Sequence, residues 1–157
     1  MKTAHRKAAR HKRKWQADPA AMGRVFACTQ PYTDAEQAQM ALPARLAFQS
    51  IVQGKGEIGD LDTVAVTVNA TLILSETVHQ ECVGVCLDAA DAVIEAKNRW
   101  RKLQRLGFSG PGMESVRTAL DLYEEFLRHI TPAQHTGAWR EVWRRIDAGK
   151  FLEEKAA

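Results

Sequence analysis

The chain has 157 residues, of which 45% are hydrophobic and 26% charged, a composition typical of an ordinary globular protein. No apolar run reaches the roughly 18 residues that span a bilayer, and three cysteines are too few for a disulfide framework. We therefore expect a single-domain protein in a reducing, cytoplasmic setting, with no membrane contact and no cofactor.

The net charge of +3 hides an asymmetry along the chain, because no acid precedes Asp18. The first 14 residues hold seven Lys or Arg, and the remainder holds 15 Lys or Arg against 19 Asp or Glu. These cations, with the tryptophan that follows, are Lys2, Arg6, Lys7, Arg10, Lys12, Arg13, Lys14 and Trp15. They suit the neutralisation of phosphates with one stacked base. We predict a basic N-terminal arm at residues 1–17 and a helical bundle domain at residues 18–157.

The first helix of the predicted domain begins at Thr33, because Thr33 and Glu36 form a capping box that satisfies backbone donors. Pro43 is expected to kink or restart this helix. Its buried side is predicted to comprise Leu42, Leu46, Phe48, Ile51 and Val52. Three glycines between residues 54 and 59 mark the loop that ends it.

Residues 61–103 carry a seven-residue repeat of mostly small, apolar side chains, which places one stripe along a helix. The stripe comprises Leu61, Ala65, Val68, Leu72, Ser75, His79, Cys82, Cys86, Ala89, Val93, Ala96, Trp100 and Leu103. Residues 63–68 also alternate and are rich in β-branched residues, but only residues 24–29 offer such a strand a partner, so we favour a helix. We expect Asp60 to cap it and Gly107 to end it. A break near residues 75–78 would make two helices of it, and this choice stays open.

Residues 109–112 are interpreted as a loop, and a helix is predicted to follow. Its apolar stripe is Met113, Val116, Leu120, Tyr123, Leu127 and Ile130. Thr131, Pro132 and Gln134 mark the start of the last helix. We predict that the inward-facing residues of the last helix are Trp139, Val142, Trp143 and Ile146. Trp100, in residues 61–103, is also predicted to face inward. The predicted fold class is all-α, a bundle of about five helices.

His79, Cys82 and Cys86 share one helical face and are the candidate metal ligands, since imidazole and thiolate groups bind zinc. Only three such groups cluster, and buried cysteines are common in cores, so we expect no metal site. The chain has no phosphate-binding glycine loop, nucleophile elbow or zinc-protease motif. We therefore predict that the protein is not an enzyme.

Two further basic groups lie in the predicted domain. They are Lys97, Arg99, Arg101, Lys102 and Arg105, and then Arg140, Arg144, Arg145 and Lys150. Arg101 and Arg105 are predicted to contact a partner together with the arm. Cations near the C-terminus of a helix also interact favourably with its dipole, which is the structural explanation for the same residues.

Residues 31–75 resemble small uncharacterised accessory proteins of bacterial prophages and plasmids. The resemblance rests on the basic start, the segment LPARLAF at residues 42–48 and the helix entry DLDTV at residues 60–64. It implies a mobile-element protein that acts in the cytoplasm of a bacterial host, as a regulator or as a binder that blocks a host system.

Two functional hypotheses follow. The first is a non-enzymatic helical binding protein that engages nucleic acid or a nucleoprotein complex through its basic arm. The second is a protein–protein inhibitor or adaptor, such as an anti-CRISPR, that binds an acidic surface of a host protein. The small-residue stripe can also bury against a second copy of the chain, so a homo-oligomer stays possible.

Overall fold

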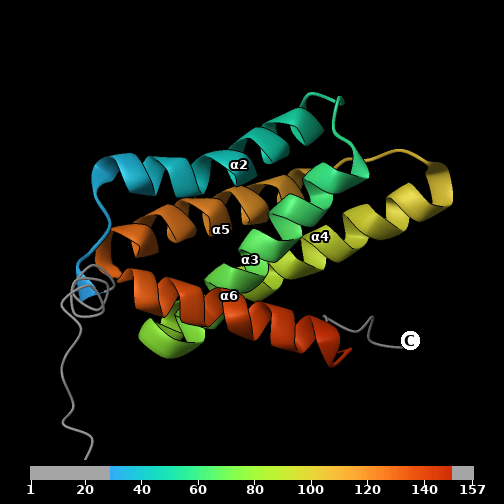
Figure 1. Ribbon diagram of the computed structural model, residues 1–157. Helices are drawn as coiled ribbons and strands as arrows, with labels where there is room; N and C mark the ends of the chain where they lie inside the picture. Colours follow the sequence, from blue (N-terminus) through green and yellow to red (C-terminus); the bar gives the residue numbers. More distant parts are fainter. Residues whose placement is uncertain (1–28, 150–157) are drawn as a thin grey trace, which may run out of the picture.

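The computed structural model describes residues 29–149, and within this range the chain forms five α-helices, one 3₁₀ turn and no strand (Figure 1). The elements are α2 (Asp34–Val52), α3 (Ile58–Val78), η1 (Gln80–Cys82), α4 (Val83–Leu103), α5 (Gly110–His129) and α6 (Pro132–Asp147). The predicted all-α bundle is therefore confirmed. The basic arm lies outside the described residues.

Helix α3 is the centre of the bundle and packs against each of the other four α-helices. Helix α3 is long and apolar enough to cross a membrane by length and composition alone. In its most apolar 18-residue stretch, 56% is buried inside the bundle. A buried core helix meets the same criteria of length and composition. The burial on several sides explains why its sequence is apolar almost all round.

The buried helix α3 accommodates hydroxyl-bearing side chains because their hydroxyl groups bond to the helix backbone. At every fourth residue from 63 to 75, a hydroxyl group donates to the carbonyl one turn earlier, at distances of 2.9 to 3.0 Å. The donors are Thr63, Thr67, Thr71 and Ser75. Bonding of this kind lets hydroxyl groups enter a core without unsatisfied donors. The preference for a helix over a strand at residues 63–68 is confirmed.

Several helix ends differ from the sequence prediction. Glu57, rather than Asp60, is the N-cap of α3, and Asp60 is the third helical residue, whose carboxylate accepts from the Glu57 N–H at 2.9 Å. The long segment breaks into two helices at η1. Helix α4 ends at Leu103 because Gln104 adopts a left-handed conformation, with φ of 52°, before Gly107 is reached. The residues that cap the C-terminal ends of α3 and α4 are thus His79 and Gln104, and neither is glycine.

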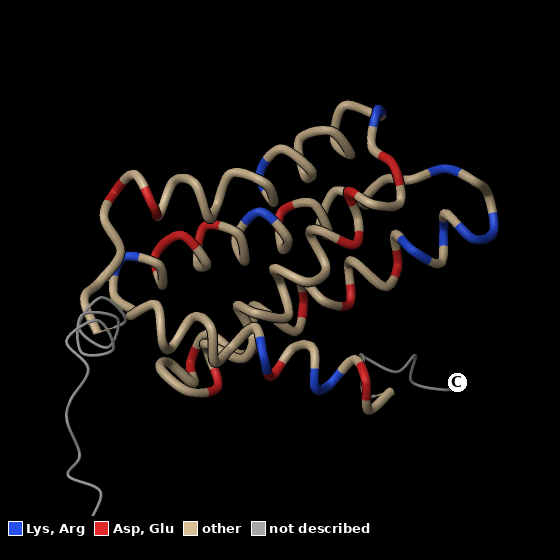
Figure 2. The backbone as a smooth tube through the Cα atoms, in the orientation of Figure 1, with Lys and Arg blue, Asp and Glu red and all other residues tan. Residues whose placement is uncertain are grey.

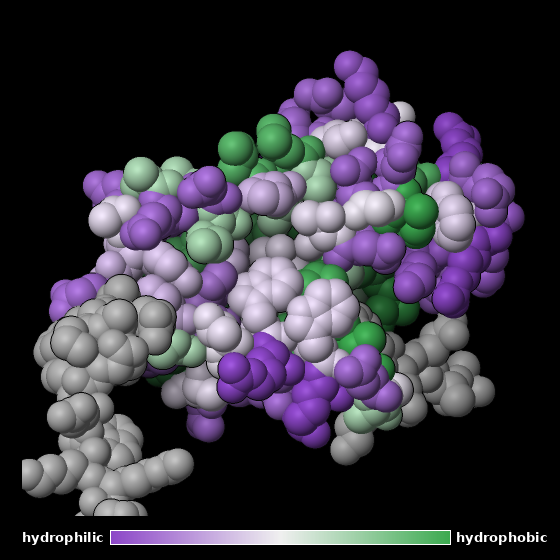
Figure 3. Space-filling model, viewed as in Figure 1, coloured by the Kyte–Doolittle hydropathy of each residue, from purple (hydrophilic) through white to green (hydrophobic). Residues whose placement is uncertain are grey.

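Helix α2 runs without interruption through Pro43, so the proline does not restart it. The capping box of Thr33 and Glu36 is present, as predicted. The prediction that Leu42, Leu46 and Val52 are buried is wrong, because these residues are 53%, 60% and 38% exposed. The inner face of α2 instead uses Ala41, Ala44, Ala47, Phe48 and Ile51, and apolar side chains show on its outer surface (Figure 3).

The predicted loop at residues 109–112 is also wrong, because Ser109 caps α5 and Gly110 already belongs to the helix. The side chain of Ser109 accepts from the Gly112 N–H at 3.2 Å. A Cβ added to Gly112 would lie 3.1 Å from the Cβ of Ala92, so α4 and α5 approach closely here. Small residues on α4 permit this approach, as the stripe predicts.

The segment before α2 is held at the end of the bundle where α5 ends and α6 begins. The hydroxyl of Tyr32 lies 3.0 Å from Nδ1 of His135, in the first turn of α6. Helix α4 ends and α5 starts at the opposite end of the bundle (Figure 1). The described chain therefore starts at one end of the bundle, and its densest positive charge lies at the other.

Candidate nucleic-acid interface

The C-terminal end of α4 and the loop after it carry a dense group of positive charges, which we call the basic end of α4 (Figure 2). Five cations occur within nine residues, and no Asp or Glu occurs between Glu95 and Glu114. The members are Lys97, Arg99, Arg101, Lys102 and Arg105. All except Arg99 have exposed side chains. The two cations named as candidate site residues in this region, Arg101 and Arg105, thus lie together on the surface.

Most other described arginines are neutralised by carboxylates. Arg45 pairs with Asp121 and Glu124 across the interface of α2 and α5. Burial lowers the pKa of Arg45, but the two carboxylates raise it by more, so the pKa lies above its ordinary value. Within residues 29–149, no carboxylate lies within 4.0 Å of Lys97, Arg101, Lys102 or Arg105. These four cations are therefore available to an external anion, which would displace their water and counterions.

Arg99 has a different role from its neighbours. It pairs with Glu95 one turn earlier on α4, and its Nη1 donates to the carbonyl of Gly107 at 2.8 Å. The Ser109 hydroxyl also donates to Glu95, at 3.3 Å. Arg99 and Glu95 therefore hold the loop between α4 and α5, and they position the basic end rather than contribute a free charge.

The helix dipole accounts for only part of the charge pattern. Arg101 and Lys102 lie in the last turn of α4, where each cation gains about 0.3–1 kcal/mol from the dipole. Lys97 lies almost two turns before the helix end, and Arg105 follows it. Because the dipole acts within the last turn, it does not explain these two positions.

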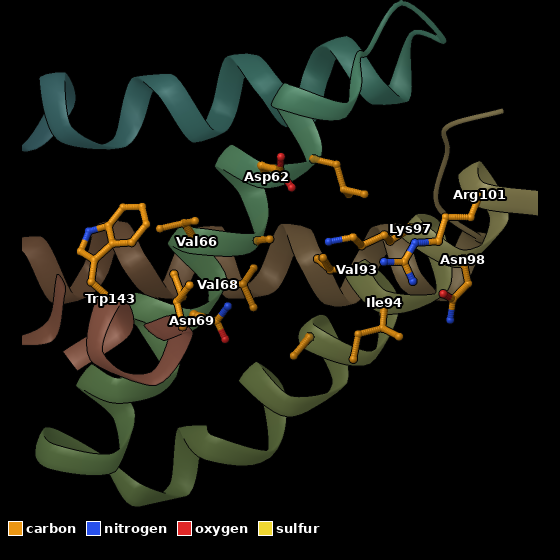
Figure 4. Close-up of a pocket in the computed structure, with 14 residues that line it drawn as sticks. Asp62, Val66, Val68, Asn69, Val93, Ile94, Lys97, Asn98, Arg101 and Trp143 are labelled. Carbon is orange, nitrogen blue, oxygen red and sulfur yellow. The ribbon is translucent and has the colours of Figure 1, made fainter. Parts of the chain in front are cut away.

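A groove of about 550 Å³ begins beside the basic end of α4 and runs between α4 and α6, over α3 (Figure 4). Its volume is within the range of small-molecule sites in proteins. Val66 and Val68 of α3 form the floor, and Val93 and Ile94 of α4 form one wall. The floor and this wall of the groove are therefore apolar.

The two ends of the groove differ in chemistry (Figure 4). Lys97 and Arg101 lie at the end nearest the tip of α4, with Asp62 of α3 on the same rim. Trp143 of α6 lies at the other end, near Asn69 of α3. An elongated apolar surface thus has cations at one end and an aromatic ring at the other.

The prediction that Trp143 faces inward is wrong, because its side chain is 54% exposed. The inner face of α6 consists of His135, Ala138 and Val142, and Trp143 is rotated about 100° from Val142 around the helix. The spacing of those three residues, three and four positions apart, indicates which side of α6 faces the core, and Trp143 does not lie on that side. Trp139 is half-buried, and its Nε1–H donates to Nε2 of His135 at 2.8 Å. Trp100 is half-buried as well.

The candidate metal ligands differ strongly in their surroundings. His79 is exposed, pairs with Glu81 at 3.1 Å and stacks on Phe126. Cys86 is buried, and its Sγ lies 3.3 Å from the Ser75 hydroxyl, while Cys82 is half-buried. Residues 29–149 contain no group of three or more His, Cys, Asp or Glu side chains that could hold a metal ion.

The candidate residues of the arm lie outside the described range, so the structure places only Arg101 and Arg105 of the predicted contact set. The groove and the exposure of Trp143 were not predicted from the sequence. Comparison with protein-family models, with curated protein sequences and with solved structures found no match for this chain.

Proposed function

We propose that this protein is a non-enzymatic helical binding protein of a phage or other mobile element, and that it engages nucleic acid or a nucleoprotein complex. Its basic arm makes one contact and the basic end of α4 makes a second. The observation that supports the proposal is the set of four exposed cations at this end without a described carboxylate partner. Proteins that bind phosphate backbones require such unneutralised cations.

The charge distribution fits this proposal better than general solubility does. A cation added for solubility would be distributed over the surface, whereas these cations lie in two stretches without acids, at residues 2–14 and 97–105. The residues between and after them are mildly acidic. This separation orients the protein on a polyanion, because only its two basic regions are attracted.

The test measures binding of labelled DNA and RNA at about 50 mM and 200 mM salt, with the full chain and with a chain lacking residues 1–15. An arm that neutralises about six phosphates gives a logarithmic salt slope of about −5, and its deletion reduces that slope. Absence of binding to both nucleic acids at the lower salt would reject the proposal.

A matched pair of variants separates the basic end of α4 from overall charge. The first combines K97Q, R101Q, K102Q and R105Q. The second combines R117Q, R128Q, R140Q and R144Q, which removes the same charge from α5 and α6. We expect the first set to weaken binding at least tenfold more than the second, because counterion release depends on local phosphate contacts.

The alternative function is a protein–protein inhibitor or adaptor, including an anti-defence factor such as an anti-CRISPR, that binds an acidic surface of a host protein. The observation that favours it is the exposure of Leu42 and Leu46 one turn apart on α2. Contiguous exposed apolar patches often mark protein interfaces, and these two side chains are neighbours on one side of α2. Capture of a host protein that is lost in a variant with L42S and L46S, without binding of nucleic acid, would support it.

A further inference from the structure

Trp143 and the groove beside it form a surface that binding of a duplex would not require. The indole is 54% exposed although it borders an apolar groove. Figure 4 shows its ring at the end of the groove opposite Arg101, with Val66 beside it. An exposed aromatic side chain and unpaired cations along one groove are the combination that proteins use to bind unpaired bases.

We infer that the groove binds single-stranded nucleic acid and that the protein prefers a single strand to a duplex. A phosphate contacts Lys97 and Arg101, and a base further along the strand enters the apolar groove and stacks on Trp143. This inference rests on the proposed function, and it specifies the class of nucleic acid.

The chemistry of the groove supports a strand with unpaired bases. The faces of bases are apolar and polarizable, so they gain by leaving water for the surface of Val66, Ile94 and Trp143. The side chains of Asp62 and Asn69 lie on the rim, where hydrogen-bonding base edges would be placed. The two cations exceed the single carboxylate in charge, so the rim attracts a phosphate.

A duplex satisfies only half of this arrangement. Its phosphates can reach the exposed cations, but its bases are paired and stacked inside the helix and cannot enter a groove without being unpaired. Double-stranded nucleic acid would therefore leave Trp143 in water. The energy from stacking is available only to a single strand, and this difference produces the preference.

The test compares single strands of about 16 nucleotides with hairpin duplexes of the same length, for DNA and RNA, at one salt concentration. We expect the W143A variant to lose about tenfold in affinity for the single strand and nothing for the duplex. The W143F variant retains most of the affinity, because a phenyl ring still stacks.

The matched control is L87A, which removes an exposed apolar side chain from the N-terminal part of α4 that does not line the groove. It should bind both forms like the original chain. Thermal unfolding of each variant shows whether a loss of binding reflects a loss of folded protein. Quenching of tryptophan fluorescence by the single strand is expected in the original chain and should fall in W143F.

The outcomes separate this inference from the proposed function. Equal affinity for both forms together with an unchanged W143A variant overturns the inference, while the proposed function stands. Loss of affinity in W143A for single strand and duplex alike also overturns it, because the ring would then act on folding or on the phosphate contact. Absence of any binding rejects the proposed function itself.

Discussion

The indole N–H of Trp139 donates to Nε2 of the buried His135 at 2.8 Å, within a cluster that also includes Tyr32 and Tyr123. An indole nitrogen can only donate, so Nε2 must carry a lone pair. The Tyr123 hydroxyl lies 2.7 Å from the same nitrogen, and the Tyr32 hydroxyl lies 3.0 Å from Nδ1. The histidine is therefore neutral in the folded protein, and burial lowers its pKa below the usual 6.5.

Acidification should therefore destabilise the bundle through His135. The unfolded chain takes up a proton near pH 6.5, whereas the folded chain does so only at lower pH, so stability falls as pH decreases through this window. The slope reaches at most about 1.4 kcal/mol per pH unit for one group. Urea unfolding between about pH 7.5 and 5.5 measures it.

Two histidine variants identify the group responsible for this pH dependence. H135Q removes the titrating ring, so the stability of this variant should vary less with pH. The exposed His129 pairs with Glu125 on the surface, so H129Q should leave the acid destabilisation in place. An unchanged pH profile in H135Q would show that another group is responsible. Burial also raises the pKa of Tyr123 to about 12, so the tyrosine stays protonated throughout this range.

Removal of a core side chain should destabilise the bundle far more than removal of an exposed leucine. Leu127 is completely buried between α3, α5 and α6, whereas Leu46 is 60% exposed. We expect L127A to reduce the free energy of unfolding by about 2–5 kcal/mol, because it leaves a cavity. The L46A variant should change it by about 0.5 kcal/mol or less. Equal effects in urea unfolding would contradict the assignment of the core.

Two glycines inside helices should respond in opposite ways to alanine. Gly137 lies in the middle of α6 with open space around its Cα, so G137A should stabilise the protein by about 0.5–1 kcal/mol. Gly112 faces Ala92 at the contact of α4 and α5, so G112A should destabilise it. Adding A92G to G112A should recover part of the loss. Thermal unfolding of these three variants and the original chain tests the close approach directly.

The thiol of Cys86 should react slowly while the protein is folded. It is buried beside Ser75, and burial raises its pKa, so little thiolate forms at neutral pH. In a variant with C28S and C82S, a colourless disulfide reagent that releases a coloured thiol should react with Cys86 only as the protein opens. A rate equal to that of the urea-unfolded chain would contradict this burial.

The sequence predicted the helices but not always which side of them faces the core. The capping boxes at Thr33 and Thr131 are local, because the two partners lie three residues apart, and the structure contains both. The exposure of Leu42 and Leu46 depends on which neighbours α2 meets. Alanines on its inner face let it lie close to the bundle, and apolar character alone did not distinguish the two faces.

The candidate site was predictable only where its residues are close in sequence. The cations at residues 97–105 form one run, so composition identified them. The groove joins residues of α3, α4 and α6 that are more than 80 positions apart at the extremes, and no local pattern connects Asp62 with Trp143. The structure was needed to show that an aromatic ring and the basic end of α4 border one groove.

The contact of Tyr32 with His135 holds the start of the described chain at the end of the bundle away from the α4 cations. Thr29, the first described residue, lies at one end of the bundle, and α5, with 20 residues, extends about 30 Å from there to the tip of α4. A phosphate bound by the α4 cations therefore lies about 30 Å from the end of the bundle at which the described chain starts, about nine duplex phosphate spacings of 3.4 Å.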